Sequence, residues 1–116
     1  MCTFCQIATG KLQAHIVYQD ALALAFLDRS PLQLGHVLLI PRQHLPTLAD
    51  VPTTQIHSFF QTVQRVASAL EAALHAEGTF VAINNKVSQS VPHLHVHIVP
   101  RRKGDGLKGF FWPRKK

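Results

Sequence analysis

The order of apolar and polar residues along the chain predicts several short strands and one long helix. Apolar runs or alternations of roughly four to eight residues are typical of strands, and they occur at 16–20, 22–28, 36–41, 80–84 and 94–99. Beyond Asp50 and Pro52 the apolar residues recur every three or four positions, the period of an amphipathic helix, and Gly78 is expected to end it. A short helical turn is expected near residues 3–9.

These elements together predict an α+β domain built on an antiparallel sheet. Strands and helices do not alternate regularly, as a parallel sheet would require. The apolar stripe of the long helix is expected to lie on the sheet, and residues 36–41 are so uniformly apolar that both of their faces should be buried. A chain of 116 residues has room for one modest core, and no linker or repeat divides it. A single domain over 1–116 is therefore expected.

Composition and charge narrow the class of protein. Hydrophobic residues make up 47% of the chain, yet no apolar run approaches the roughly 20 residues of a transmembrane helix. The N-terminus lacks the basic region and apolar core of a signal peptide, so we expect a cytoplasmic protein that does not engage a membrane. Twelve basic residues against six acidic ones give a net charge of +6. This excess favours anionic partners such as nucleotides, although part of it is also explained by a solvated basic tail after residue 100.

Three histidines stand at alternate positions of the last predicted strand. His93, His95 and His97 are separated by apolar residues, so in a strand the imidazoles would form a row with successive members about 6.6 Å apart. Such a row can consist of solvated surface histidines, bind a metal, or act on phosphorus through a nucleophilic imidazole with a second imidazole moving protons. The core residues between them disfavour the first interpretation.

The two cysteines form a C-x-x-C at the start of the chain. Cys2 and Cys5 can be a redox pair, two unrelated thiols, or half of a zinc site. The redox motif usually opens a helix inside a βαβ unit, which the predicted order of elements lacks. A tetrahedral zinc site needs two more ligands, and distant histidines commonly supply them.

The segment HLHVHIV resembles the signature of the histidine-triad (HIT) family. FLDRSP, GHVLLIPRQH, INN and QSVPHLHVHIVPR are similar to successive blocks of that family in the same order, so the resemblance covers most of the chain. It implies the HIT-like fold, a five-stranded antiparallel sheet with one long and one short helix, and a homodimer. It also implies a nucleotide hydrolase or transferase that acts on the α-phosphate of nucleoside phosphoramidates or dinucleotides.

The resemblance assigns roles to four histidines. His95 matches the nucleophile that forms a nucleotidyl-histidine intermediate, and His97 matches the residue that contacts the phosphate or leaving group. His93 would complete the network, and His36 matches a histidine that orients the nucleophile from the neighbouring strand. His15, His57 and His75 match no such position and are expected to have no role in catalysis.

Nucleotide-binding positions carry over in the same way and imply a purine nucleotide of the AMP type. Asp28 would hold the ribose hydroxyls and Phe26 would contact the base, although core packing explains Phe26 equally well and a turn before Ser-Pro also explains Asp28. Trp112 is similar to a C-terminal tryptophan that lines the partner subunit's site. The full set implied by the resemblance is Phe26, Asp28, Asn84, Gln89, Ser90, His95, His97 and Trp112.

The loop before the triad departs from the family pattern. Relatives carry glycines there, whereas NNKVSQ has none and has Ser88 where the backbone approaches the phosphate. The segments VSQSVPH and KGDGLKGFFWPR resemble a branch whose plant members also act on adenylyl sulfate. Hydrolysis of adenylyl sulfate, of dinucleoside polyphosphates or of DNA adenylate therefore stays open, as does a nucleotide-binding module with incidental turnover. Nucleic acid is the less expected partner, because no zinc-finger domain is appended.

The resemblance also favours the zinc interpretation of the C-x-x-C. In relatives with N-terminal cysteines, zinc is held by both thiols, by the histidine that ends the PR-x-H block and by the first histidine of the triad. The matching residues here are Cys2, Cys5, His44 and His93. Such a structural zinc would fasten the N-terminal turn to the sheet and leave His95 and His97 free for chemistry.

Overall fold

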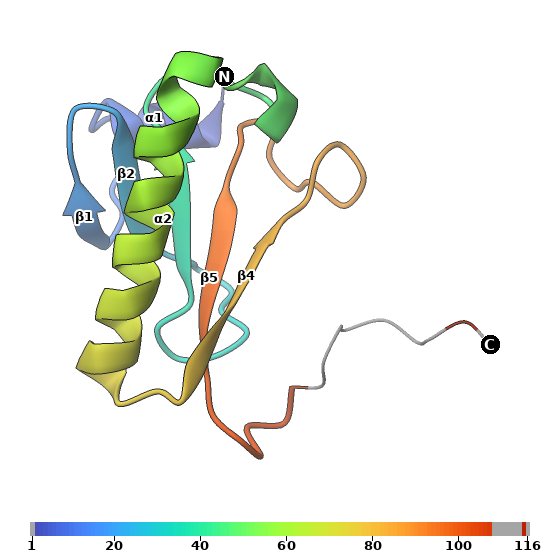
Figure 1. The fold of residues 1–116 in the computed structure, drawn as a ribbon. Helices are drawn as coiled ribbons and strands as arrows, with labels where there is room; N and C mark the ends of the chain where they lie inside the picture. Colours follow the sequence, from blue (N-terminus) through green and yellow to red (C-terminus); the bar gives the residue numbers. More distant parts are fainter. Residues whose placement is uncertain (1, 108–114, 116) are drawn as a thin grey trace.

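A computed structural model of the chain describes residues 2–107 and 115 and has an α+β architecture around one sheet (Figure 1). The sheet has five antiparallel strands in the order β1-β2-β3-β5-β4, which confirms the predicted fold class. The strands are β1 (Ile16–Gln19), β2 (Ala23–Leu27), β3 (Val37–Pro41), β4 (Gly78–Ile83) and β5 (Val96–Arg101). The helices are α1 (Thr3–Ala8), the 3-10 turn η1 (Leu48–Asp50), which the sequence pattern did not predict, and α2 (Thr53–Leu74).

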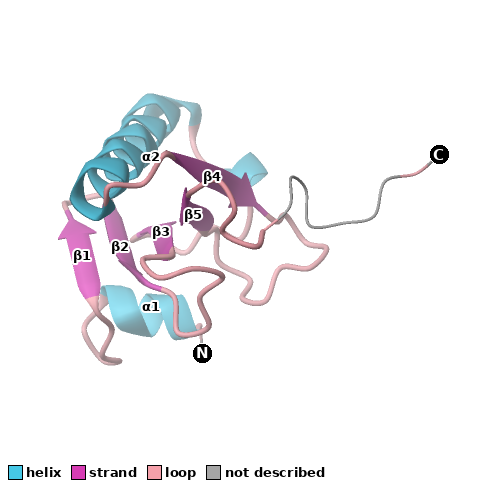
Figure 2. Ribbon diagram, turned by 90° about the horizontal axis from the view of Figure 1, so that it is seen from below, coloured by secondary structure: helices cyan, strands magenta, loops and turns pink. Residues whose placement is uncertain are grey.

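The two faces of the sheet carry separate cores. Figure 2 shows α2 on one side of the strands and α1 on the other. Phe59, Val63 and Val66 of α2 pack against the first face, and Phe4 and Ile7 of α1 pack against the second. Every residue of β3 is buried because this central strand is covered on both sides, as its uniform apolar character predicted. Each fully buried Leu or Ile side chain in such a strand stabilises the fold by about 1.5–3 kcal/mol.

The long helix ends earlier than predicted. Its last residue is Leu74, and His75 takes the left-handed conformation (φ 51°) that closes the helix, so the prediction of an end at Gly78 is wrong. The N–H of Ala76 then donates to the carbonyl of Glu71 (3.0 Å), which satisfies one of the last helical carbonyls. Gly78 instead begins β4, where it pairs with Arg101.

The last strand begins two residues later than predicted. Its pairing with β3 begins at Val96, opposite Leu39, and the chain just before it is irregular. The N–H of Leu94 donates to the carbonyl of Leu45 (2.7 Å) rather than to a strand neighbour. Leu94, Val96 and Ile98 are nevertheless all fully buried on the α2 side, so the alternation inferred from the sequence holds through the irregular part. The side chains between them face the α1 side.

No helix among the described residues is long and apolar enough to cross a membrane. The aromatic residues at 110–112, which include Trp112, lie outside the described residues.

Candidate functional site

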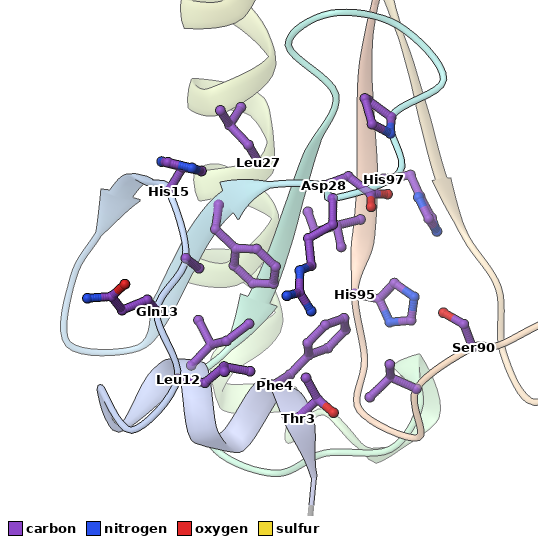
Figure 3. A pocket seen from close by; sticks show the side chains of 17 residues that line it. Thr3, Phe4, Leu12, Gln13, His15, Leu27, Asp28, Ser90, His95 and His97 are labelled. Atoms are coloured by element: carbon purple, nitrogen blue, oxygen red, sulfur yellow. The ribbon is translucent and has the colours of Figure 1, made fainter.

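A pocket of about 1140 Å³ opens on the α1 side of the sheet. Its walls come from α1, the segment after it, the end of β2 and the segment that leads into β5 (Figure 3). Phe4, Leu12 and Phe26 supply apolar surface. Polar groups gather at the end where Figure 3 shows Asp28, Ser90, His95 and His97. An apolar pocket with a few convergent polar groups is the usual form of a small-molecule site.

His95 lies at the floor of this pocket with its ring held from two sides. Its Nδ1 is 2.8 Å from the carbonyl oxygen of His93, and its ring packs edge to face on Phe4, with 5.0 Å between the centroids. A carbonyl oxygen only accepts hydrogen bonds, so the Nδ1–H of His95 is the donor. The Nε2 of His95 therefore carries the free lone pair, which is the state a nucleophilic imidazole requires.

His36 contacts His97 rather than His95. Its Nε2 is 3.0 Å from Nδ1 of His97 and 3.5 Å from a carboxylate oxygen of Asp28. Burial lowers the pKa of His36, although the Asp28 carboxylate opposes this shift. Burial, reinforced by His95 and His36, lowers the pKa of His97 to about 4. Both imidazoles are therefore neutral at pH 7, and the ring of His95 is oriented by the backbone carbonyl of His93, whereas His36 contacts His97.

Phe26 and Asp28 make the core contact and the turn that the sequence left open, and both also line the pocket. Phe26 is buried against Phe4, with 5.4 Å between ring centroids in an edge-to-face arrangement, and it also lines the pocket. One carboxylate oxygen of Asp28 accepts from the N–H of Ser30 (3.0 Å) and so begins a turn. The other oxygen faces His36, and Asp28 also lines the pocket.

The glycine-free loop brings only part of the expected phosphate set to the pocket. Ser90 lines the pocket, whereas Asn84 and Gln89 are not among its lining residues. The side chain of Gln89 braces the loop instead: its oxygen accepts from the N–H of Lys86 (2.7 Å), and its nitrogen donates to the carbonyl of Pro46 (2.5 Å). Lys86 and Ser88 have φ values of 69° and 60°, so the backbone takes at two non-glycine residues a conformation that glycine adopts most easily.

The pocket also contains residues that sequence reasoning did not select. Thr3, Gln13, His15 and Arg29 line it together with the matched residues. His15, expected to have no role, stands near Gln13 at the end of the pocket away from His97 in Figure 3. No motif or spacing marked these positions, because they reach the pocket only through the path of the chain: Thr3 begins α1, Gln13 and His15 lie between α1 and β1, and Arg29 lies beyond β2.

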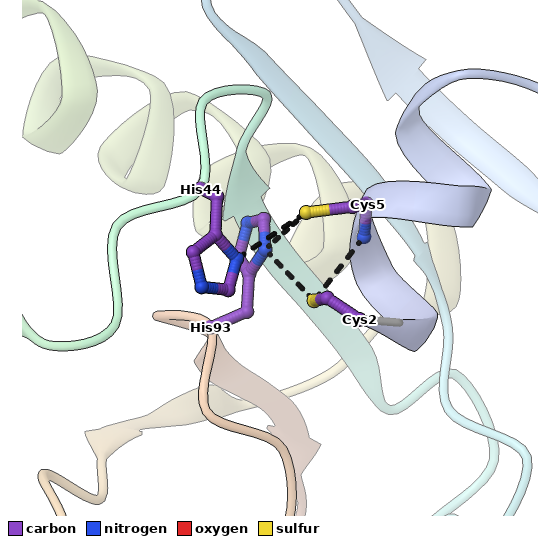
Figure 4. A group of neighbouring side chains, drawn as sticks. All are labelled: Cys2, Cys5, His44 and His93. Atoms are coloured by element: carbon purple, nitrogen blue, oxygen red, sulfur yellow. Dashed lines mark hydrogen bonds between the residues drawn. The ribbon is translucent and has the colours of Figure 1, made fainter.

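A second cluster joins the N-terminal cysteines to two distant histidines (Figure 4). The ligand atoms of Cys2, Cys5, His44 and His93 all lie within 4.8 Å of one another. Nδ1 of His93 is 3.3 Å from the sulfur of Cys2 and 3.5 Å from that of Cys5, and Nδ1 of His44 is 3.3 Å from the sulfur of Cys5. Zinc–sulfur and zinc–nitrogen bonds of about 2.3 and 2.05 Å at a tetrahedral angle separate S and N by about 3.6 Å.

The hydrogen bonds around this cluster suit a metal. The Nε2 of His93 is 2.8 Å from the carbonyl oxygen of Pro41 and must donate to it, so the lone pair of His93 is on Nδ1 and faces the sulfurs. A histidine whose second nitrogen is held by a carbonyl is typical of metal sites. Two thiolates and two imidazole nitrogens at these separations fit one tetrahedral zinc ion. The side chain of His93 therefore belongs to this cluster, while its carbonyl serves His95.

Comparisons with known proteins agree with this geometry. The HIT domain family matches residues 9–104. A HIT-like protein of Methanocaldococcus jannaschii is 37% identical over 91% of this chain and 83% of its own length. An adenylylsulfatase of Arabidopsis thaliana is 33% identical over 91% of the chain and 55% of its own length. An asymmetrical bis(5'-nucleosyl)-tetraphosphatase of Schizosaccharomyces pombe is 35% identical over 79% of the chain and 52% of its own length.

Solved structures extend the likeness to the backbone. A HIT family protein of Bacillus subtilis superposes with a TM-score of 0.89 at 34% identity, covering 98% of this chain and 82% of its own. A zinc-bound histidine triad protein of Mycobacterium smegmatis superposes with a TM-score of 0.85 at 40% identity, covering 92% and 79%. The match over residues 9–104 and these relatives together show that the chain belongs to the HIT family.

Proposed function

We propose that this chain is a nucleotide hydrolase that cleaves at the α-phosphate of adenosine phosphoramidates or closely related nucleotides. The observation that carries the proposal is His95, which lines the pocket with its proton fixed on Nδ1 by the carbonyl of His93 and its Nε2 lone pair free. The names of two relatives, an adenylylsulfatase and a bis(5'-nucleosyl)-tetraphosphatase, support a nucleotide substrate.

The reaction proceeds in two balanced steps. Nε2 of His95 attacks the α-phosphorus, a phosphorus–nitrogen bond to the imidazole forms, and the bond to the amine breaks as the amine takes a proton from its surroundings. Water then attacks the nucleotidyl-His95, gives up a proton, and releases AMP with the free imidazole. For adenosine 5'-phosphoramidate the net products are AMP and ammonia. His97, neutral and beside His95, is the residue that hydrogen-bonds the phosphate or the leaving group.

The pocket offers complementary surfaces for the rest of the nucleotide. The rings of Phe4 and Phe26 give an apolar wall for a purine base. Asp28 has a carboxylate at the polar end that suits the ribose hydroxyls, and Ser90 stands beside the two imidazoles on the phosphate side. Asn84 and Gln89 have a weaker case for the same phosphate, because neither lines the pocket.

We propose in addition that Cys2, Cys5, His44 and His93 hold one structural zinc ion. The donor set and its separations support this assignment, as does the zinc-bound relative from Mycobacterium smegmatis. When bound, zinc would supply a cross-link between α1, the segment after β3 and the segment before β5.

A homodimer is proposed on the edge of the sheet. β4 is a terminal strand in the sheet order, and Val81 in its middle is 44% exposed. A terminal strand with an exposed apolar residue in its middle is a natural place for a second chain to pack. Sedimentation of the purified protein tests this: one dissociable species of twice the chain mass is expected, and a monomer at all concentrations contradicts the proposal.

AMP release from adenosine 5'-phosphoramidate tests the main proposal. Wild type is expected to turn over, His95→Ala to be inactive, and His57→Ala, on the helix face away from the pocket, to match wild type. Rapid denaturation during turnover should trap a nucleotidyl-protein in wild type alone. A wild type that binds AMP without hydrolysing the phosphoramidate, adenylyl sulfate, dinucleoside polyphosphates or adenylated DNA would instead support a binding module.

A further inference from the structure

Three neighbouring side chains, two of which line the polar end of the pocket, have the composition of a metal site. Ligand atoms of Asp28, His36 and His97 lie within 4.8 Å of one another. Two histidines and one carboxylate are a common ligand set for divalent transition metals. Figure 3 shows Asp28 and His97 at the same end of the pocket. Whether these groups bind a metal or one another depends on where the imidazole protons lie.

A backbone group decides the position of the first proton. The N–H of Leu32 lies 3.0 Å from Nδ1 of His36. A backbone N–H can only donate, so Nδ1 of His36 must be the acceptor and its proton must be on Nε2. The Nε2–H of His36 faces Nδ1 of His97 at 3.0 Å and a carboxylate oxygen of Asp28 at 3.5 Å.

The second proton follows from the first. Because Nε2 of His36 donates, Nδ1 of His97 accepts, and the proton of His97 must be on its Nε2. His97 thereby keeps an N–H to offer to an anion in the pocket. A carboxylate has only acceptor oxygens, so Asp28 also favours a proton on the Nε2 of His36. One backbone donor thus fixes the hydrogen-bonding roles of two imidazoles in succession.

The loop around Leu32 is built to hold that donor in place. The N–H of His36 donates to the carbonyl of Gln33 (3.1 Å), and the N–H of Asp28 donates to the carbonyl of His36 (2.9 Å). The side chain of Gln33 donates to the carbonyl of Asp105 (2.9 Å), which ties the loop to the segment after β5. The hydrogen bond to His36 comes from the backbone of Leu32, whose side chain is 46% exposed.

We infer that the backbone N–H of Leu32 is a positioning group that sets the tautomers of His36 and His97 and closes this cluster to divalent metals. A metal on Nε2 of His36 would force the proton onto Nδ1, directly against the N–H of Leu32, and would leave two donors facing each other. The inference that this cluster excludes divalent metals does not depend on the proposed function. The consequence for catalysis, an N–H of His97 directed at the phosphate or leaving group, rests on the proposed function.

NMR of the wild-type protein labelled with ¹⁵N-histidine tests the inference directly. Long-range ¹H–¹⁵N spectra separate protonated from unprotonated ring nitrogens. Both His36 and His97 are expected to be protonated on Nε2 alone, and these shifts should stay unchanged when excess Zn²⁺ is added to zinc-loaded protein. Protonation of either residue on Nδ1, or zinc-dependent shifts of both rings, would overturn the inference.

Two substitutions then separate the backbone donor from the side chain. Leu32→Pro removes the N–H, whereas Leu32→Ala keeps it and serves as the matched control. Leu32→Pro should release the His36 and His97 tautomers and lower kcat/KM for the phosphoramidate by about 10- to 100-fold, because the buried Nδ1 of His36 would lose its hydrogen-bond donor. Leu32→Ala should match wild type in both measurements.

The NMR experiment and the substitutions together also separate a failure of this inference from a failure of the proposed function. Tautomers that match the expectation in a wild type without turnover would refute the hydrolase and leave the role of Leu32 standing. Turnover with unaltered tautomers in a folded Leu32→Pro would refute the role of Leu32. If Leu32→Pro does not fold, the wild-type spectra still decide.

Discussion

Replacing Ser88 by glycine is expected to stabilise the protein. Ser88 has φ 60°, a left-handed conformation that costs a residue with a Cβ about 1–2 kcal/mol relative to glycine. Glycine in turn loses about 0.5–1 kcal/mol more backbone entropy on folding. Ser88 is exposed, so little packing is lost with its side chain. The net expected gain for Ser88→Gly is therefore about 0.5–1 kcal/mol, or about 2–6 °C in Tm for a domain of this size.

Thermal and urea unfolding of Ser88→Gly, with Val87→Gly beside it, measure this gain. Val87 is the exposed neighbour and is not among the non-glycine residues with positive φ, so Val87→Gly should be neutral or destabilised by the added chain entropy. An unchanged m-value is expected, because the folded loop does not move. Equal or lower stability of Ser88→Gly compared with wild type would refute the argument that the loop is strained at this residue.

The other predictions concern the metal cluster, the pocket histidines and one turn. Removing zinc by chelation, or replacing Cys5 with Ala, should lower the Tm by about 10 °C or more in thermal unfolding. Added zinc should restore the Tm of the chelated wild type but not that of Cys5→Ala. A Tm that does not change on chelation contradicts the zinc proposal. The folded-state pKa values of His36 and His97 lie below the ordinary 6.5, and that of His97 is about 4, so below pH 6.5 the unfolded chain binds more protons than the folded chain. The stability that these two histidines contribute is therefore complete above pH 6.5 and is lost as the pH falls toward 4. Urea midpoints that stay level from pH 7 to pH 5 would count against this. Gly35→Ala should destabilise by about 1–2 kcal/mol in urea unfolding, since Gly35 has φ 90°, whereas the methyl carbon of Leu74 that would lie 2.4 Å from the added Cβ is the end of a side chain that can move; wild-type stability would contradict the strain at this φ.

The sequence predicted those parts of the fold that depend on local periodicity. The uniform apolar run of β3 predicted a strand covered on both faces, and the alternation around Val96 and Ile98 predicted which side of the last strand is core. The boundaries were less predictable because they depend on partners. β5 begins where Leu39 is available to pair with Val96, and α2 ends where His75 can turn left-handed.

At the site, too, the sequence pattern predicted some features, whereas others depend on tertiary contacts. The alternate spacing predicted that His95 and His97 lie on one side of the strand, and both line the pocket. The resemblance predicted that Cys2 and Cys5 lie together with two histidines, as they do. The partner of His36 could not be predicted, since it depends on the register between β3 and β5, which sets Leu38 opposite His97. The N–H of Leu32 has no signature at all, because any residue except proline offers the same group.

The side chain and the main chain of His93 contact different groups, so the effects of the two contacts can be measured separately. Its imidazole faces the thiols, whereas its main-chain oxygen fixes the proton of His95. Any amino acid at position 93 retains that oxygen. A substitution there would therefore remove a ligand of the proposed zinc site without removing the acceptor for the proposed nucleophile, so an activity loss in such a variant would measure how far that site keeps the main chain in register. The first histidine of the triad thus connects the proposed zinc site to the ring of the proposed nucleophile.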